Sequence, residues 1–173
     1  MTSGSIEPKR TPRLPPRWFI RSAWVVHRAI HRFTGGRRGL ATPTPGGKFG
    51  YLRLKTVGRR SGQERAAILG YYEDGPNLVT LAMNGWADAE PAWWLNLQAH
   101  PDAVVELKNG SRAVRARAAE GEERARLWAK VRDYSGYGDD VDAYATLRSS
   151  ETAVVVLEPR PDSGHTLVAV KGA

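Results

Sequence analysis

Residues 51–72 read YLRLKTVGRRSGQERAAILGYY, two strand-like runs around a short basic turn. The first run alternates Leu52 and Leu54 with Arg53 and Lys55, and this period of two is typical of a strand with one buried face. The turn that follows holds two glycines and a serine, residues that favour tight turns. The stretch therefore predicts a β-hairpin whose turn carries unusual positive charge.

Strand-like runs separated by turn signals continue to residue 157. Further strands are predicted at 78–83, 103–108, 112–118 and 153–157, with short helices at PAWWLNLQAH and at 121–131. Asn109-Gly110 is a strong hairpin signal. About six strands, with few helices and no regular strand–helix alternation, predict an α+β, mainly β protein whose antiparallel sheet curls into a barrel.

With 173 residues, the chain is long enough for one folded domain. We expect a disordered basic arm at 1–16, an amphipathic basic helix at 17–34, a Gly- and Pro-rich linker at 35–50, the barrel domain at 51–159 and a tail at 160–173. The tail holds a further candidate strand at 166–170.

The segment 17–33 has helical periodicity. At about 100° per residue, one side carries only apolar side chains: Phe19, Ala23, Val26, Ile30 and Phe33. The other side carries Arg17, Arg21, Arg28 and Arg32. Two interpretations stay open: the helix lies on an anionic membrane surface, or it packs its apolar stripe on the barrel.

The net charge of +8 and the pI of about 10.1 predict an anionic partner. Residues 1–65 hold fifteen Lys and Arg residues against Glu7 and Glu64 only. Nucleic acid, a membrane surface and an anionic small molecule are the classes to weigh. No helix-turn-helix, RNA-recognition or zinc-finger pattern is present, so a nucleic-acid-binding module is the less favoured alternative.

The sequence lacks the residues that several kinds of site would need. There is no cysteine, and the four histidines are scattered, so we expect no metal site and no thiolate nucleophile. No apolar run approaches the roughly 20 residues of a spanning helix, and no signal-peptide core follows the N-terminal charges. The sequence favours the cytoplasm, with the inner face of the membrane as the peripheral alternative.

The turn Thr56–Val–Gly–Arg–Arg–Ser–Gly62 is a candidate anion site. Its guanidiniums, one hydroxyl and backbone N–H groups could converge on a phosphate. Arg65 on the next strand adds a further cation. The plainer interpretation is an ordinary solvated turn.

Two aromatic groups are further candidates. Trp93 and Trp94 are either core anchors or walls of a flat cofactor site, with Asn96 as a polar handle. Tyr134, Tyr137 and Tyr144 lie in a glycine-broken segment. This segment could form a mobile cover over a substrate, or its phenols could simply pack.

The motifs KTVGRRSGQER, PAWWLNLQAHPDAVVEL, GEERARLW and VVVLEP, in this order, resemble the deazaflavin-dependent nitroreductase family, whose members use reduced coenzyme F-420. The resemblance runs from about Leu52 to Pro159 and is weak before residue 50. It implies a split β-barrel of the flavin-reductase kind and hydride transfer to a quinone or nitroaromatic acceptor. FMN, haem or a fatty acid is the alternative ligand for such a barrel.

The resemblance also implies the site residues. Arg59, Arg60 and Ser61 would take the cofactor's phosphate, and Lys55 and Arg65 its anionic tail. Catalytic roles would fall to Tyr137, at the mouth of the site, and to Tyr134. The residues lining the deazaflavin ring would be Ala66, Ala67, Ile68, Leu81, Ala82, Met83, Asn84, Ala92, Trp93, Trp94 and Asn96.

The chain departs from the family pattern where the acceptor would bind. Gly70 and Met83 replace a tyrosine and a serine of a nitroreducing relative, and Asn84 replaces a lysine. Asp140 stands where a third tyrosine is expected. A larger and more apolar pocket favours a quinone over a nitroimidazole. The sequence does not determine the oligomeric state.

Overall fold

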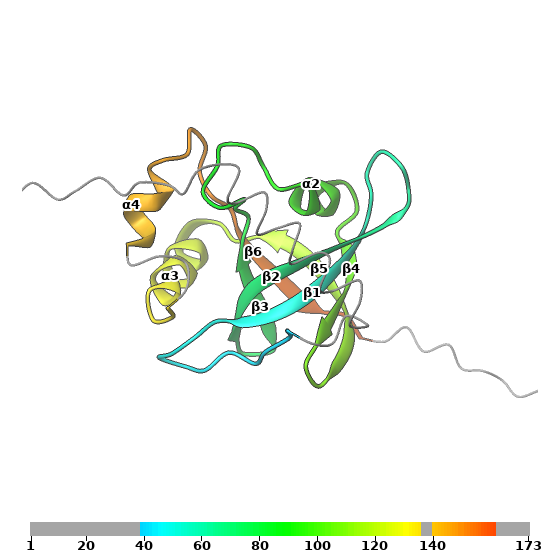
Figure 1. The fold of residues 1–173 in the computed structure, drawn as a ribbon, viewed down its shortest axis with the longest axis horizontal. Coiled ribbons are helices and arrows are strands. Elements are labelled where there is room, and N and C mark those ends of the chain that lie inside the picture. Colours follow the sequence, from blue (N-terminus) through cyan, green and yellow to red (C-terminus); the bar gives the residue numbers. More distant parts are fainter. Residues whose placement is uncertain (1–38, 136–139, 162–173) are drawn as a thin grey trace, which may run out of the picture.

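The computed structural model describes residues 39–135 and 140–161 (Figure 1). Its strands are β1 (Gly50–Val57), β2 (Glu64–Asp74), β3 (Asn77–Leu81), β4 (Asp102–Leu107), β5 (Gly110–Ala118) and β6 (Val154–Pro159). Its helices are α2 (Ala92–Ala99), α3 (Gly121–Val131) and α4 (Val141–Ala145). The strands close into an antiparallel barrel in the order β1-β2-β3-β6-β5-β4, with β4 pairing back to β1. The predicted fold class is confirmed.

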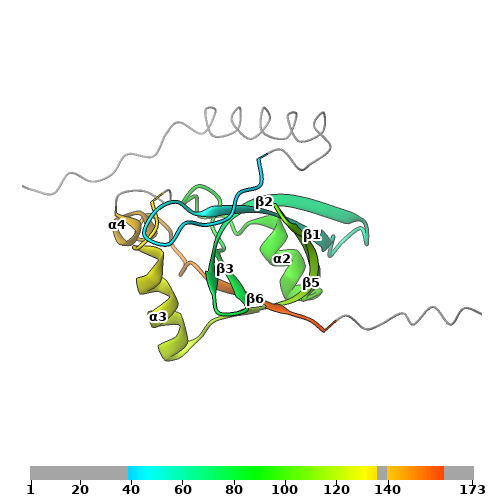
Figure 2. The ribbon, with the colours of Figure 1, turned by 90° about the horizontal axis from the view of Figure 1, so that it is seen from below.

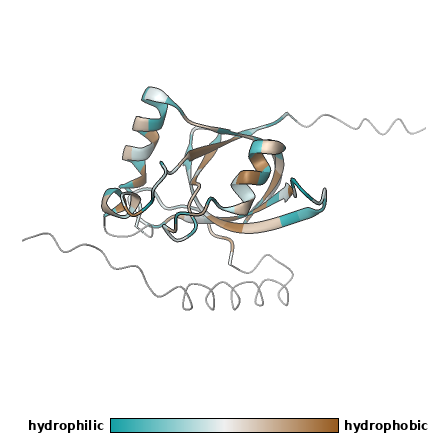
Figure 3. Ribbon diagram, turned by 90° about the horizontal axis from the view of Figure 1, so that it is seen from above, coloured by the Kyte–Doolittle hydropathy of each residue, from teal (hydrophilic) through white to brown (hydrophobic). Residues whose placement is uncertain are grey.

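The predicted hairpin is present as β1 and β2, which pair from Gly50 opposite Tyr71 to Val57 opposite Glu64. Leu52 and Leu54 are fully buried, as the alternation predicts. They belong to the core inside the barrel, where α2 adds Trp93, Trp94 and Leu97. Figure 2 shows the strands enclosing α2, and Figure 3 shows apolar colour gathered on these same strands.

A second core lies on the outer side of β3 and β6. Val79, Leu81, Val154 and Val156 point outward from the barrel and pack with Leu127 of α3. The rings of Phe49, Tyr72 and Tyr134 join the same cluster. Figure 1 shows α3 and α4 beside this part of the barrel. These elements therefore cover one side of the barrel from outside.

The barrel is split along one edge of β2. Along its other edge β2 follows β1 over almost its whole length, but it pairs with β3 only at Tyr72, Glu73 and Asp74. Before Tyr72, β2 makes no register pairing with β3 among the described residues, although Thr80 Oγ1 of β3 donates to Gly70 O at 2.8 Å. The loop 82–91 and α2 follow β3 and lie above β2 in Figure 1. An unpaired strand edge next to a helix is a place where a flat ligand can reach backbone groups.

Residues 39–49, which belong to the predicted linker, pack against the barrel. Leu40 and Phe49 are buried. Ala41 exchanges two backbone hydrogen bonds with Tyr51, and Lys48 forms a β-bridge with Ser135. The predicted arm, the helix 17–34 and the tail strand 166–170 lie outside the described residues.

Candidate functional site

Two positions of the basic turn between β1 and β2 favour glycine. Gly62 has a φ of +65°, in the left-handed region. A Cβ at Gly58 would lie 2.9 Å from Ser61 Oγ. The Gly58 and Gly62 N–H groups donate to Gln63 O and Gly58 O at 2.8 and 2.7 Å. The turn is therefore tightly closed on itself.

This closure corrects one part of the sequence hypothesis. Five backbone N–H groups of the turn already have acceptors in the protein, those of Gly58, Arg59, Ser61, Gly62 and Gln63. A nest of free backbone donors is therefore wrong for this turn. Any anion bound here must be held mainly by side chains.

The guanidiniums of the turn are available for that task. Arg59, Arg60 and Arg65 are exposed, and none has a carboxylate partner among the described residues. Arg65 Nη2 donates only to Ser61 Oγ and Gln63 Oε1, both at 3.3 Å. Ten other basic residues do have acidic partners: Arg53, Lys55, Arg115, Arg117, Arg124, Arg126, Lys130, Arg132, Arg148 and Arg160. Uncompensated positive charge thus gathers at the turn, which favours an anion there.

Lys55 differs from these arginines. Its Nζ lies 2.8 Å from Glu106 and 3.7 Å from Glu64. The hydrogen bond to Glu106 raises the pKa of Lys55, and in turn lowers the pKa of Glu106, which Arg53 also contacts at 3.2 Å. The charge of Lys55 is therefore largely balanced within the protein, so it is a weaker candidate for an anionic tail.

Asn96 ties α2 to the turn. Its side chain is buried, its Nδ2 donates to Thr56 Oγ1 at 3.2 Å, and its Oδ1 accepts from the Arg59 N–H at 3.1 Å. Arg59 Nη1 reaches the same oxygen at 3.4 Å. The amide predicted as a handle for the ring is thus engaged inside the protein, where it fixes the position of Arg59.

The predicted ring-lining residues come from β2, from the end of β3 with the loop after it, and from α2. Ala66 and Ala92 are exposed, and Ala67, Ile68 and Met83 are partly exposed. Asn84 is exposed as well, whereas Leu81, Ala82, Trp93 and Trp94 are buried. The structure places both tryptophans in the barrel core. The accessible members of this set are therefore small or apolar side chains together with the polar Asn84.

An ion pair between a buried arginine and a partly exposed glutamate holds the loop after β3. Arg148, whose side chain is fully buried, lies 2.8 Å from Glu90 Oε1. Its Nη1 also donates to Ala82 O at 3.0 Å and to Thr152 Oγ1 at 2.8 Å. The sequence analysis missed Arg148 and Glu90, because no local pattern relates residues that are 58 positions apart.

The same loop contains a strained residue. Trp86 has a φ of +62°, rare for a bulky side chain. Its ring stacks on Tyr144 of α4 at 6.0 Å. Asp140 caps α4 by accepting from the Ala143 N–H at 3.0 Å, and this helix was not predicted. The loop beside the split is thus fixed to α4 and the segment that follows it.

The structure describes only one of the two candidate catalytic tyrosines. The ring of Tyr134 is buried and lies 5.1 Å from Phe49 and 5.3 Å from Tyr72. The ring of Tyr134 therefore packs inside the protein, as in the second interpretation of this segment. Tyr137 lies outside the described residues.

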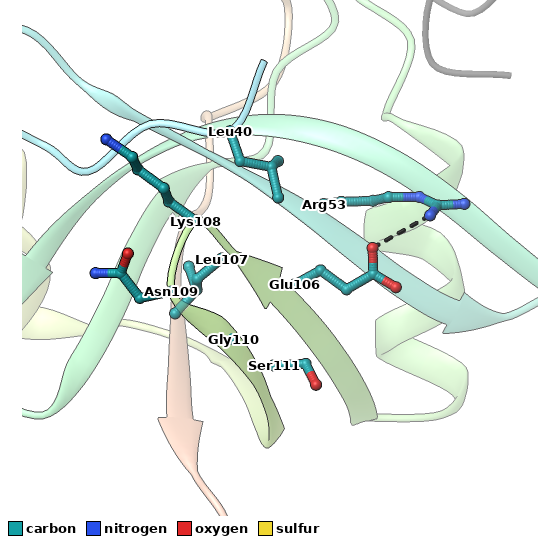
Figure 4. A pocket seen from close by; sticks show the side chains of 8 residues that line it. All are labelled: Leu40, Arg53, Glu106, Leu107, Lys108, Asn109, Gly110 and Ser111. Atoms are coloured by element: carbon teal, nitrogen blue, oxygen red, sulfur yellow. Dashed lines mark hydrogen bonds and ion pairs between the residues drawn. The ribbon is translucent and has the colours of Figure 1, made fainter. Parts of the chain in front are cut away.

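A separate hollow of about 490 Å³ lies beside the turn between β4 and β5 (Figure 4). Its lining residues are Leu40, Arg53, Glu106, Leu107, Lys108, Asn109, Gly110 and Ser111. None of the predicted site residues lines it. It is open and polar, so we do not place the cofactor there.

The described part of the chain holds no helix that is long and apolar enough to cross a membrane. It also holds no cluster of three His, Asp or Glu side chains suited to a metal ion.

The fold is that of a split-barrel protein, and three exposed arginines without a described carboxylate partner lie at its β1–β2 turn. The family model described as "F420H(2)-dependent quinone reductase" matches residues 24–159. The chain belongs to this family, which makes it an oxidoreductase with reduced coenzyme F-420 as its cofactor. The match begins at residue 24, before Leu52, where the resemblance read from the sequence begins.

Individual proteins agree with the family. An F420H(2)-dependent quinone reductase of Mycobacterium tuberculosis (strain ATCC 25618 / H37Rv) is 31% identical over 150 residues, covering 83% of this chain and 97% of the relative. The solved "Structure of F420-H2 Dependent Reductase (FDR-A)" is 25% identical with a TM-score of 0.55, covering 62% of this chain and 93% of that one. A structure titled "domain-swapped dimer", 24% identical with a TM-score of 0.59 and covering 80% and 99%, shares the fold.

Proposed function

We propose that this protein reduces a quinone with a hydride from coenzyme F-420, binding the anionic part of the cofactor at the β1–β2 turn and its ring in the split beside β2. The observation that carries this placement is the trio Arg59, Arg60 and Arg65, three exposed guanidiniums with no carboxylate partner among the described residues. They stand at one end of the open edge of β2. The donor set fits a phosphodiester with a carboxylate tail.

The turn residues bind the anions. Arg59 and Arg60 would take the phosphate, because a guanidinium presents paired N–H donors to two oxygens at once. The hydroxyl of Ser61 adds a donor, and Arg65 would contact the carboxylates of the tail. Asn96 holds the backbone of Arg59 at 3.1 Å, so this part of the site is preorganised before the cofactor binds.

The split would orient the ring and keep water out. The reduced deazaflavin supplies a hydride and avoids one-electron chemistry. Ala66 and Ala67 are small enough for a flat ring to approach the edge of β2, and Met83 gives an apolar wall. Positioning of the two reactants, rather than a dedicated acid or base, is then the main contribution of the protein.

The acceptor is proposed to be a quinone rather than a nitroaromatic compound. Gly70 stands where a nitroreducing relative has a tyrosine, and its carbonyl accepts a hydrogen bond from Thr80 Oγ1 at 2.8 Å. Met83, partly exposed, is apolar where a serine would be polar. A proton would come from Tyr137 or from solvent. Tyr134, with its ring packed on Phe49, is proposed to support that wall of the site.

Titration with oxidised coenzyme F-420, followed by its fluorescence, tests the placement. We expect the double variant Arg59→Ala/Arg60→Ala to bind at least about 100-fold more weakly, because each charge-assisted hydrogen bond contributes roughly 1.5–3 kcal/mol. Arg115→Ala/Arg132→Ala is the matched control, since both residues are exposed and it removes the same charge. Equal losses of affinity in both double variants would mean that the arginines of the turn act only through the net charge of the protein. No binding by the parent chain would overturn the cofactor placement as a whole.

Turnover with a soluble menaquinone analogue and with a nitroimidazole tests the acceptor. We expect the quinone to be reduced faster than the nitroimidazole. Met83→Ser should make the two rates more similar. A chain that prefers the nitro compound would contradict the proposed acceptor. The cytoplasmic location expected from the sequence stays a prediction.

A further inference from the structure

Large exposed apolar side chains gather on one face of the barrel. Tyr51, Val57 and Val104 are 46%, 41% and 41% exposed, and they are the large hydrophobic side chains exposed to this degree in the described part of the chain. All three point outward from the neighbouring strands β1 and β4, since Leu54 and Val105 between them point into the core. We refer to Tyr51, Val57, Val104 and the side chains between them as the β1–β4 face.

The charges in the middle of this face are already paired. Arg53 and Lys55 both contact Glu106, at 3.2 and 2.8 Å. Lys55 stands directly opposite Val104 in the register, and Arg53 opposite Glu106. Glu64 lies 3.7 Å from Lys55, so the two cations face two carboxylates. A partner that covers the face therefore meets exposed apolar side chains around a charge-balanced group, and it needs no charge of its own.

No described helix covers this face, in contrast to the other side of the barrel. There, α3 and the ring of Tyr134 cover the outward valines of β3 and β6. The contacts of α2 with β1 come from the barrel interior, where Trp94 and Leu97 lie among Leu52 and Leu54. The β1–β4 face thus lacks the cover that its counterpart has.

The described chain begins at the end of this face. Ala41 N–H donates to Tyr51 O at 3.1 Å, and Tyr51 N–H donates to Ala41 O at 2.8 Å. Leu40 is buried and lines the hollow in which Arg53 and Glu106 meet (Figure 4). The preceding 38 residues are therefore tethered directly beside the face.

Those residues contain a segment of suitable chemistry and length. The stripe of the helix predicted at 17–33 is apolar along its whole length. A 17-residue helix is about 25 Å long, and the eight residues of β1 extend over about 26 Å. The residues 34–39 between the helix and the barrel can bridge about 20 Å. The helix can thus reach the face and match its length.

We propose that the amphipathic segment 17–33 docks its apolar stripe on the β1–β4 face of its own barrel. Docking removes Val57 and Val104 from water, while the arginines of the segment face solvent. The short tether makes this contact intramolecular and gives it a high effective concentration. The stripe is then unavailable to a lipid bilayer until the segment is released.

The absence of native cysteine permits a direct test in the full-length chain. Val104→Cys is combined in turn with Ala23→Cys, Val26→Cys or Ile30→Cys, and disulfide formation is followed by mass spectrometry at low protein concentration. Ala125→Cys, on the exposed side of α3, replaces Val104→Cys in the control series. We expect at least one Val104 pair to form an intramolecular disulfide about tenfold faster than every control pair. Equal rates, or disulfides only between two chains, would overturn the proposal.

Labelling of the single variant Val104→Cys by a thiol reagent gives a second readout that needs no correct helix register. The Cys should react about tenfold more slowly than in the same chain with Val26→Glu/Ile30→Glu. An unchanged rate would contradict docking. Sedimentation with vesicles of anionic phospholipid completes the test: binding by the parent chain that Val26→Glu/Ile30→Glu abolishes, together with an unprotected Val104→Cys, would assign the stripe to the membrane instead.

Discussion

Asn96 Oδ1 accepts a hydrogen bond from the backbone N–H of Arg59 at 3.1 Å, and so joins the buried side of α2 to the basic turn. The second half of the amide donates to Thr56 Oγ1, which is itself buried. Helix, strand and turn therefore meet at one side chain. The guanidinium of Arg59 is consequently held by the core of the barrel and not only by its own flexible loop.

Replacing Asn96 with Leu should weaken both the fold and the cofactor site. The change leaves Thr56 Oγ1 and the Arg59 N–H without their partner, and an unsatisfied buried group costs about 1–3 kcal/mol. We expect a loss of that size in urea unfolding and a clear weakening of F-420 binding. Gln98→Leu on the exposed side of the same helix is the control. Unchanged binding by a folded Asn96→Leu variant would show that Arg59 needs no such support.

The hairpin itself was predictable because its information is local. Leu52 and Leu54 alternate with polar neighbours, and glycines mark the turn, so strand, register and turn follow from adjacent residues. The exposed arginines proposed to bind the anion were equally visible, since residue identity is read directly from the sequence. The helix at Gly121–Val131 agrees with its predicted range for the same reason.

The contacts that hold the candidate site in place could not be predicted from adjacent residues. Asn96 and Arg59 are 37 positions apart, and Arg148 and Glu90 are 58 positions apart. These contacts exist only because the closed barrel brings distant segments together. The backbone donors of the turn were misjudged for a related reason, because the exact closure of a loop decides which N–H groups are already used.

Removing the arginine of the pair Arg148–Glu90 should lower the stability of the fold. Arg148→Met leaves the Glu90 carboxylate without its cation; because the Glu90 side chain is 30% exposed, we expect a loss of about 1–3 kcal/mol, less than for a fully buried pair. Urea unfolding measures this loss. Arg115→Met, at an exposed pair with Asp102, should cost less than about 1 kcal/mol. A double variant Arg148→Met/Glu90→Gln that is no more stable than Arg148→Met would contradict direct coupling between the two groups.

Gly58 should not tolerate a side chain. A Cβ there would lie 2.9 Å from Ser61 Oγ and 3.2 Å from Gln63 O, so Gly58→Ala must distort the turn. We expect F-420 binding to weaken more than stability falls, because the strain falls on the exposed loop. Adding Ser61→Gly removes the nearer contact and should restore part of the affinity. If Gly58→Ala binds like the parent, the shape of the turn is not what arranges its arginines.

Asp74 should make the free energy of unfolding decrease at acidic pH. Hydrogen bonds from Arg126, at 2.9 Å to each oxygen, and from Lys130, at 3.1 Å, lower the pKa of Asp74 from its ordinary 3.8 to about 2. A carboxylate with a depressed pKa stabilises the folded state above its unfolded pKa, and the contribution is lost as the pH falls through the folded value. The window for this group is therefore about pH 4 to pH 2.

Asp74→Asn tests this directly. At pH 7 we expect the variant to be about 1–2 kcal/mol less stable than the parent, a value reduced for the solvent that reaches the partly exposed Arg126 and Lys130. The difference should shrink below pH 4 and be small at pH 2, where the carboxyl of the folded parent is about half protonated. Urea unfolding at several pH values measures it, with Asp133→Asn, on an exposed residue, as the control. A difference that stays constant from pH 7 to pH 2 would mean that Asp74 acts through its shape and not through its charge.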